Sequence, residues 1–274
     1  MTMTDGPVVA PATRTLLAHG TDVFVRVWDG RKTPALILHG WGSRGERWLP
    51  VAEVLAARGH AVALPDFPGF GASPPPPAPW RVEDYACAID EVVRGLGMRE
   101  SLVVAHSFGA RIAVRLAATG RAGIRAMLLT GAAGLRPRLT WRRRLLSRSA
   151  RAGAAIFALP PLRPAGDLAR RALYRALGSM DYYLARGVMR ETFKLVIEED
   201  LADDMKAVGV PVYLLWGADD RSTPPEDGRR MAALMPSAVL EVVNGLGHAL
   251  PHERPDLVAA RAEELFARSG GAGR

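Results

Sequence analysis

Hydrophobic and polar positions along the chain follow two periods in turn. Short apolar runs bounded by Gly, Pro and Asp predict strands, whereas apolar residues three and four positions apart predict helices. The segment RTLLAHGTDVFVRVWDG, residues 14–30, predicts two strands with turns at Gly20 and Asp29-Gly30. Further strands are expected at 34–38, 60–66, 101–105, 124–130, 210–217 and 238–243, and helices at 47–59, 81–96, 108–119 and after each of the last two strands. This alternation predicts an α/β fold, with a mostly parallel eight-stranded sheet and helices on both faces.

Residues 132–206 interrupt the alternation. They contain several helical runs, among them GDLARRALYRAL and RGVMRETFKLVIEEDL, and no clear strand. We therefore expect a helical cap, inserted after the sixth strand, that covers one end of the sheet. Residues 1–131 and 207–274 would then form the core of the fold.

The insertion also carries most of the positive charge. The whole chain has a net charge of +8, whereas the stretch from Gly134 to Ile197 alone has 14 Arg or Lys and 3 Asp or Glu. Two interpretations stay open. The basic helices could present a solvated Arg-rich face, or a surface that attracts an acidic carrier protein or an anionic membrane. No nucleic-acid-binding motif is present, so nucleic acid is not an expected partner.

Composition narrows the class of protein. A chain of 274 residues with 49% hydrophobic and 23% charged residues suits a globular protein with a large core. Its single cysteine, Cys87, can form no internal disulfide. We see neither the pattern of a signal peptide nor an apolar run long enough to span a membrane. We expect a cytoplasmic monomer or small homo-oligomer, and no metal site, because no His, Cys and Asp cluster has metal-ligand spacing.

One serine has the setting of a catalytic nucleophile. In VVAHSFGARIAV, residues 103–114, an apolar strand ends, Ser107 follows, and a helical run begins. A nucleophile on so sharp a turn needs small residues two positions before and after it. Gly109 meets this requirement, and Ala105 adds one methyl group that a well-packed turn can accept. The alternative is that Ser107 only caps the helix.

An acid and a base for this serine follow later in the chain. Asp220 lies in GADDRSTP and His248 in GLGH, each after one of the last two strands. The order serine, acid, histidine and the positions at strand ends fit a triad in which the histidine takes the serine proton and the acid orients the histidine. Asp219 is the rival acid, and His252 is the rival base.

Two backbone N–H groups are expected to hold the oxyanion. Phe108 follows the proposed nucleophile directly, and Trp41 lies in the loop LILHGWG after the third strand. A tight turn with a hydrogen-bonded histidine is the alternative for this loop. His106, next to the serine, is expected to be structural.

These motifs resemble the α/β-hydrolase superfamily over roughly residues 15–268. The resemblance rests on HGWG (39–42), DFPGFGAS (66–73), AHSFGA (105–110), GADDRSTP (217–224) and GLGH (245–248). It implies a cofactor-free Ser-His-Asp hydrolase whose cap shapes an acyl pocket. Cap side chains that could line this pocket, or simply pack between helices, are Tyr182, Tyr183, Met189 and Phe193.

The expected activity is that of a carboxylesterase acting on a small or medium, largely apolar ester. Haloalkane dehalogenases and epoxide hydrolases carry Asp where this chain has Ser107. Three alternatives remain. The HGWG and PGFG motifs and the basic cap resemble pimeloyl carrier-protein methyl ester esterases, although His106 stands where that family has Trp. Carbon–carbon hydrolases of ring-cleavage products are disfavoured, because no Trp follows His248 closely. A non-catalytic ligand-binding protein is the third alternative.

Overall fold

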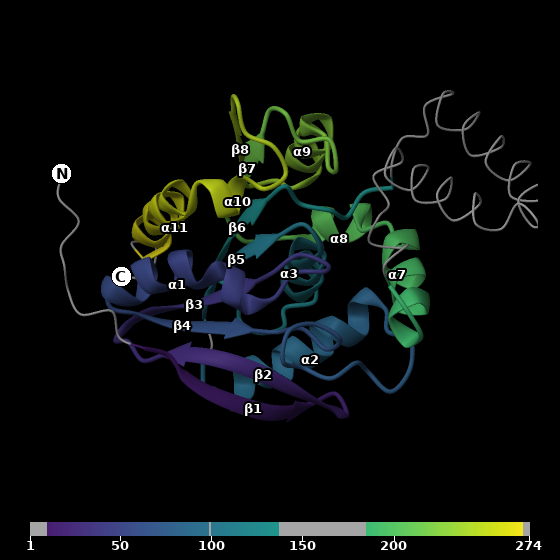
Figure 1. The fold of residues 1–274 in the computed structure, drawn as a ribbon. Helices are drawn as coiled ribbons and strands as arrows, with labels where there is room; N and C mark the ends of the chain where they lie inside the picture. Colours follow the sequence, from purple (N-terminus) through teal and green to yellow (C-terminus); the bar gives the residue numbers. More distant parts are fainter. Residues whose placement is uncertain (1–9, 99, 137–184, 271–274) are drawn as a thin grey trace, which may run out of the picture.

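The computed structural model describes residues 10–98, 100–136 and 185–270 (Figure 1). Within these ranges, eight strands form a single sheet. The strands are β1 (Ala12–Ala18), β2 (Thr21–Trp28), β3 (Lys32–Leu38), β4 (His60–Pro65), β5 (Leu102–His106), β6 (Ala126–Thr130), β7 (Val212–Gly217) and β8 (Ala238–Val243). The helices are η1 (Gly45–Trp48), α1 (Leu49–Ala57), α2 (Val82–Gly95), α3 (Phe108–Ala118), α7 (Val188–Glu198), α8 (Ala202–Ala207), α9 (Pro225–Leu234), α10 (Leu250–Glu253) and α11 (Pro255–Gly270).

The strand order places the loops that carry the predicted site residues at one edge of the sheet. That order is β1-β2-β4-β3-β5-β6-β7-β8. β2 runs antiparallel to both of its neighbours, and the other pairs are parallel. The carboxyl ends of parallel strands share an edge, so the loops that follow β3, β5, β6, β7 and β8 gather there.

Helices cover both faces of the sheet because alternate side chains of each strand point to opposite sides. In β5, Val103 and Ala105 pack into the core cluster that contains residues of α2 and α3. Leu102 and Val104 pack into a second cluster with α1 and α11. Figure 1 shows α1 and α11 on one side of the sheet, and α2 and α3 on the other. The continuous apolar run of β5 is therefore buried on both faces, as in other parallel sheets.

The predicted fold class is confirmed: the sheet is mostly parallel, has eight strands and is covered on both faces. Element boundaries differ from the prediction by a few residues at most. The helix expected at 47–59 begins at Leu49, because Gly45–Trp48 forms a separate 3-10 turn. Pro50 then lies in the first turn of α1, where its missing N–H costs nothing.

Only the two ends of the predicted insertion, residues 132–136 and 185–206, belong to the described residues. The second of these contains α7 and most of α8, and Leu201 and Met205 at α8 are fully buried in the core cluster. The helical runs predicted between residues 137 and 184 lie outside the described ranges, so the division into core and cap stays a prediction. Among the described helices, none is both long and apolar enough to cross a membrane.

Candidate active site

Ser107 occupies a strained turn between β5 and α3. Its φ is +50° and its ψ is −109°, a conformation that costs a residue other than glycine about 1–3 kcal/mol. Although Ser107 precedes the first helical residue, its side chain makes no capping hydrogen bond to α3. The helix-cap alternative therefore finds no support, and the hydroxyl is available for another role.

The small residues on either side of Ser107 allow the turn to pack tightly. A Cβ atom on Gly109 would lie 2.7 Å from the carbonyl oxygen of His39 and closer still to that of Leu38. The start of α3 thus lies against the backbone at the end of β3, where only glycine fits. Ala105 is fully buried within the core cluster. The methyl group of Ala105 is accommodated there, so a residue larger than glycine at this position leaves the turn intact.

Asp220 and His248 form a close pair. The Nδ1–H of His248 donates a hydrogen bond of 2.8 Å to Oδ2 of Asp220, which leaves Nε2 of the imidazole free of a proton in the neutral ring. The backbone N–H groups of Ser222 and Thr223 donate to Oδ1 of Asp220 at 2.8 and 2.9 Å. The Asp220 side chain is 1% exposed, and these bonds satisfy its buried charge. The rival Asp219 is exposed.

Thr223 joins this pair, and the sequence analysis missed it. Its hydroxyl lies 2.9 Å from Oδ2 of Asp220, 3.2 Å from Nδ1 of His248 and 3.0 Å from the carbonyl oxygen of Gly131. A hydroxyl so placed fixes the carboxylate and the ring relative to β6. The only signal in the sequence was its position in the turn after Asp220, where Ser and Thr commonly bond to the backbone.

Two glycines allow close packing, one beside the Asp220–His248 pair and the other beside Ser107. A Cβ on Gly131 would lie 3.1 Å from both Oδ2 of Asp220 and Nδ1 of His248. A Cβ on Gly40 would lie 3.5 Å from Cβ of Ser107. The imidazole rings of His248 and His106 are 4.6 Å apart, and His106 directly precedes Ser107. Ser107, Asp220 and His248 therefore all lie at the carboxyl edge of the sheet, after β5, β7 and β8 respectively.

His106 packs against the imidazole ring of His248. It is buried, and its Nδ1–H donates to the carbonyl oxygen of Thr130 at 2.9 Å. Burial is the main cause that holds the pKa of His106 well below its ordinary value, and the charge of His248 is the second cause. The imidazole ring of His106 is therefore neutral where it packs against His248. The rival base His252 packs against Trp48, with ring centres 5.5 Å apart, and Asp220 bonds to His248 instead.

The loop after β3 is positioned by His39. The Nδ1–H of His39 donates to the carbonyl oxygen of Gly40 at 2.7 Å, and Nε2 accepts the N–H of Phe67 at 3.0 Å. Burial lowers the pKa of His39 to about 4. His39 is thus a hydrogen-bonded turn histidine, which is the alternative stated for this loop. The same turn contains Trp41, directly after Gly40.

The two predicted oxyanion donors fit this arrangement. Phe108 is the first residue of α3, so its N–H has no acceptor within the helix. Trp41 follows Gly40, which packs against Ser107. The rings of Trp41 and Phe108 are 5.2 Å apart, so the two residues lie side by side next to the serine.

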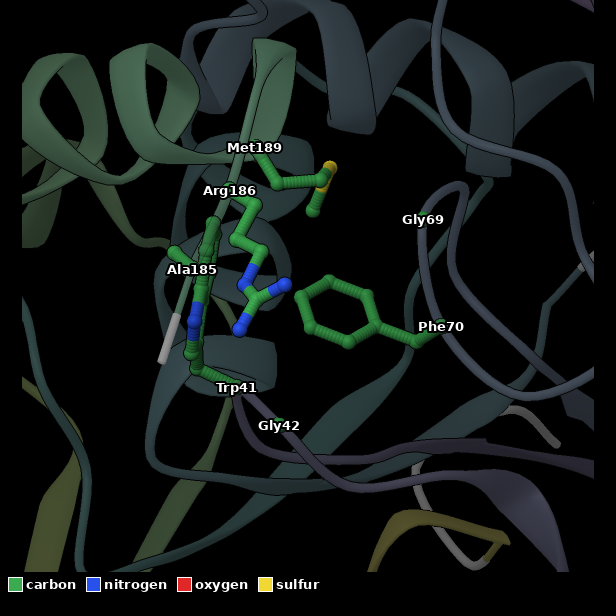
Figure 2. A pocket seen from close by; sticks show the side chains of 7 residues that line it. All are labelled: Trp41, Gly42, Gly69, Phe70, Ala185, Arg186 and Met189. Carbon is green, nitrogen blue, oxygen red and sulfur yellow. The ribbon is translucent and has the colours of Figure 1, made fainter. Parts of the chain in front are cut away.

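A cavity of about 320 Å³ opens beside Trp41. Figure 2 shows its lining residues, which are Trp41, Gly42, Gly69, Phe70, Ala185, Arg186 and Met189. Of the four predicted pocket residues, Met189 lines this cavity, and Phe193 packs against Trp41 with ring centres 4.9 Å apart. Tyr182 and Tyr183 lie outside the described residues.

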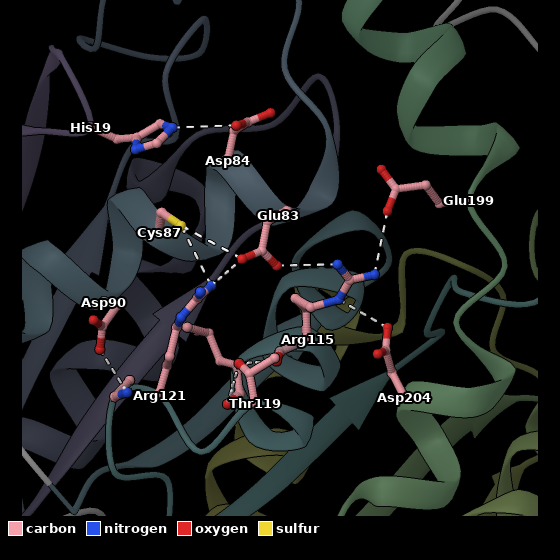
Figure 3. Close-up of polar contacts among 12 residues, drawn as sticks. His19, Glu83, Asp84, Cys87, Asp90, Arg115, Thr119, Arg121, Glu199 and Asp204 are labelled. Atoms are coloured by element: carbon pink, nitrogen blue, oxygen red, sulfur yellow. Dashed lines mark hydrogen bonds and ion pairs between the residues drawn. The ribbon is translucent and has the colours of Figure 1, made fainter.

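A network of charged side chains holds the α7–α8 segment against the core. Figure 3 shows Arg115 of α3 between Glu83 of α2 on one side and Glu199 and Asp204 on the other. The nitrogens of Arg115 lie 3.1 Å from Glu83, 3.4 Å from Glu199 and 2.9 Å from Asp204. Arg121 also pairs with Glu83. Hydrogen bonds and opposite charges lower the pKa of Glu83 against the effect of burial.

The described residues contain no group of three or more His, Cys, Asp or Glu side chains that could hold a metal ion.

The chain is similar to known hydrolases over most of its length. Residues 35–261 match the family model described as the alpha/beta hydrolase family. A non-heme haloperoxidase of Rhodococcus erythropolis is 27% identical over 266 residues, covering 88% of this chain and 94% of the relative. A pimeloyl-[acyl-carrier protein] methyl ester esterase of Chromobacterium violaceum is 31% identical over 258 residues, covering 86% and 95%. Among solved structures, a bacterial membrane phospholipase A superposes with a TM-score of 0.74 at 23% identity, covering 96% and 88%.

Proposed function

Because the chain belongs to the alpha/beta hydrolase family, we propose that it is a serine hydrolase that cleaves carboxylic esters of small to medium, largely apolar acids. The observation that carries this proposal is the strained Ser107, free of a capping role, at the sheet edge where Asp220 bonds to His248. The family relationship supports hydrolase chemistry in general, and the choice of an ester bond is the proposal.

In the proposed reaction, Oγ of Ser107 attacks the ester carbonyl while Nε2 of His248 takes the hydroxyl proton. Asp220 accepts the Nδ1–H bond and stabilises the imidazolium that forms. The N–H groups of Trp41 and Phe108 hold the oxyanion, an interaction commonly worth about 10²–10³ in rate for each donor. His248 then returns the proton to the departing alcohol, and water repeats the sequence on the acyl-enzyme.

The cap would complete the substrate site. We take residues 132–206 as the cap and residues 1–131 and 207–274 as the core. Met189 lines the cavity beside Trp41, and Phe193 packs against the ring of Trp41. The aromatic side chains of Trp41 and Phe70 in the cavity wall suit an apolar acyl chain.

The test is labelling with a fluorophosphonate probe and hydrolysis of p-nitrophenyl esters of increasing acyl length. We expect the wild type to label and to turn over, and Ser107→Ala to do neither. Ser237→Ala, which changes an exposed serine before β8, should behave like the wild type. A wild type that neither labels nor hydrolyses any ester would contradict the proposal and favour a ligand-binding protein.

A second candidate is the hydrolysis of an ester attached to an acidic carrier protein. Two observations favour it: the 31% identical carrier-protein ester esterase and the 14 basic residues between Gly134 and Ile197. A surface of this charge would steer an acidic partner, and salt would screen the attraction. Activity that falls with salt on carrier-bound esters but not on small esters would favour this candidate; an equal response would count against it.

A further inference from the structure

We propose that the cavity beside Trp41 selects esters whose acyl chain ends in an anionic group, and that Arg186 pairs with this group. The inference deepens the proposed ester hydrolysis and rests on it. It goes beyond a general preference for apolar acyl chains because it names a charged feature of the substrate and the residue that recognises it.

The described lining of the cavity combines apolar walls with a cation. Trp41, Phe70 and Met189 supply the apolar surface, and Arg186 is the one charged side chain among the described residues that line it. Figure 2 shows the guanidinium of Arg186 directed toward the ring of Phe70, beside the Trp41 side chain. Among the described residues, no carboxylate forms an ion pair with Arg186. An acyl chain with an anionic end would match both properties of the cavity.

The position of the cavity assigns it to the acyl part of the ester rather than to the alcohol. The departing alcohol must lie near His248, because His248 returns its proton. None of the lining residues comes from the loop that carries His248; they lie at 41–42, 69–70 and 185–189. Trp41 instead provides a proposed oxyanion N–H, next to which the acyl carbon must lie. The chain attached to that carbon can therefore extend over Trp41 toward Arg186.

The surroundings add positive potential at the same place. A second cavity of about 610 Å³ shares Gly42, Gly69 and Phe70 with the first and is also lined by Arg44 and Arg47. Among the described residues, neither lining contains Asp or Glu. Arg44 is paired with Glu46 at 2.7 Å, so within the described linings Arg186 and Arg47 are the cations left to attract an anion. The field at the cavity mouth therefore favours a negatively charged substrate.

The experiment compares two esters that differ only at the far end of the acyl chain. One is the mono-p-nitrophenyl ester of a linear dicarboxylic acid, and the other is the p-nitrophenyl ester of the matching monocarboxylic acid. The measured quantity is the ratio of kcat/KM for the anionic ester to that for the neutral ester, across a series of chain lengths. Proteins to compare are the wild type, Arg186→Met, Arg186→Lys and Arg229→Met.

We expect a wild-type ratio well above one at the best chain length. Arg186→Met should lower it by about tenfold or more, the usual value of a hydrogen bond to a charged group. Arg186→Lys should retain part of it, and raising the salt concentration should reduce it. Arg229→Met removes the same charge from an exposed pair on α9 and should leave the ratio as in the wild type. An equal ratio in wild type and Arg186→Met would overturn the inference.

A binding measurement separates this inference from the proposed function. In the Ser107→Ala variant, the half-amide of the dicarboxylic acid and the amide of the monocarboxylic acid are titrated by calorimetry. Tighter binding of the anionic amide, lost when Arg186→Met is added, would support the inference even if the wild type hydrolysed no ester. Equal binding of the two amides would refute the inference even if neutral esters were hydrolysed.

Discussion

At the scale of single residues, the conformation of Ser107 is held by neighbours that are distant in sequence. Its N–H donates to the carbonyl oxygen of Thr130 at 3.1 Å, and its own carbonyl oxygen accepts the N–H groups of Ala110 and Ala133 at 3.2 Å each. These bonds tie the turn to α3 and to the segment after β6. They offset the cost of a positive φ and fix the backbone from which the Ser107 side chain extends, as the proposed catalysis requires.

Gly109 is a residue next to Ser107 where a single added methyl group should be harmful. We expect Gly109→Ala to destabilise the protein by about 2–3 kcal/mol, because its Cβ would collide with backbone oxygens of Leu38 and His39 that cannot rotate away. Esterase activity should fall by more than the loss of folded protein explains, because any shift of α3 moves Ser107 and Phe108. Urea unfolding and ester hydrolysis measure the two effects.

The matched control for this change is Gly209→Ala. A Cβ at Gly209 would meet nothing within 4 Å, so we expect a change within about 0.5 kcal/mol and unaltered activity. If Gly109→Ala behaved like Gly209→Ala, the close approach of α3 to β3 would not be a requirement of the fold.

At the scale of elements, polar contacts with α2, α3 and the segment before α2 join the α7–α8 segment to the core, in addition to the burial of its apolar side chains. The N–H of Trp80 donates to the hydroxyl of Thr192 at 3.1 Å, and the N–H of Val82 donates to Oε1 of Glu199 at 3.0 Å. Arg115 adds ion pairs to α2 and α8. The cavity is lined by Met189 of α7 on one side and by core loops on the other, so these contacts help to fix its shape.

We expect Arg115→Met to destabilise the protein by about 2 kcal/mol, because three carboxylates would lose their shared partner while partly buried. Hydrogen exchange should increase in residues 185–207 more than in the central strands, since the lost bonds hold this segment. Arg94→Met is the control, because Arg94 forms an exposed pair with Asp90 within α2 and should change stability by at most about 0.5 kcal/mol. Equal exchange rates in the two variants would argue against an anchoring role for Arg115.

At the scale of the whole molecule, buried neutral histidines make stability depend on pH. His39 and His106 both lie at the centre of the fold, with pKa values lowered by burial. In the unfolded chain, the pKa of each of these histidines is about 6.5. Below that pH the unfolded state binds protons that the folded state does not, so acid favours unfolding.

We therefore expect the free energy of unfolding to fall as the pH decreases from about 6.5 to about 5, before most carboxylates titrate. His39, with a pKa of about 4 in the folded state, should contribute roughly 3 kcal/mol once the pH has fallen to that value. Urea unfolding at a series of pH values measures this dependence. In His39→Gln, which can keep one donor and one acceptor, the slope should be shallower; an unchanged slope would show that His39 is not a source of the dependence.

The sequence by itself determined the order of elements, the sheet class and the position of the turn that holds Ser107. Periodicity is a local property, so β5 and α3 could be predicted from the apolar runs on either side of Ser107. The turn between them is defined by steric requirements that Ala105 and Gly109 satisfy within a few residues. Asp220 and His248 could be named because strand ends of a parallel sheet must meet at one edge.

Only the tertiary structure decided which of these neighbours interact. The bond from His248 selects Asp220 over the exposed Asp219, and Thr223 enters the site through contacts with β6 and with a loop beyond β8. The grouping of Arg186 with Trp41 and Phe70, and that of Arg115 with Glu83 and Asp204, joins residues separated by long stretches of chain. Such contacts depend on how helices and loops pack in space, which no local pattern in the sequence encodes.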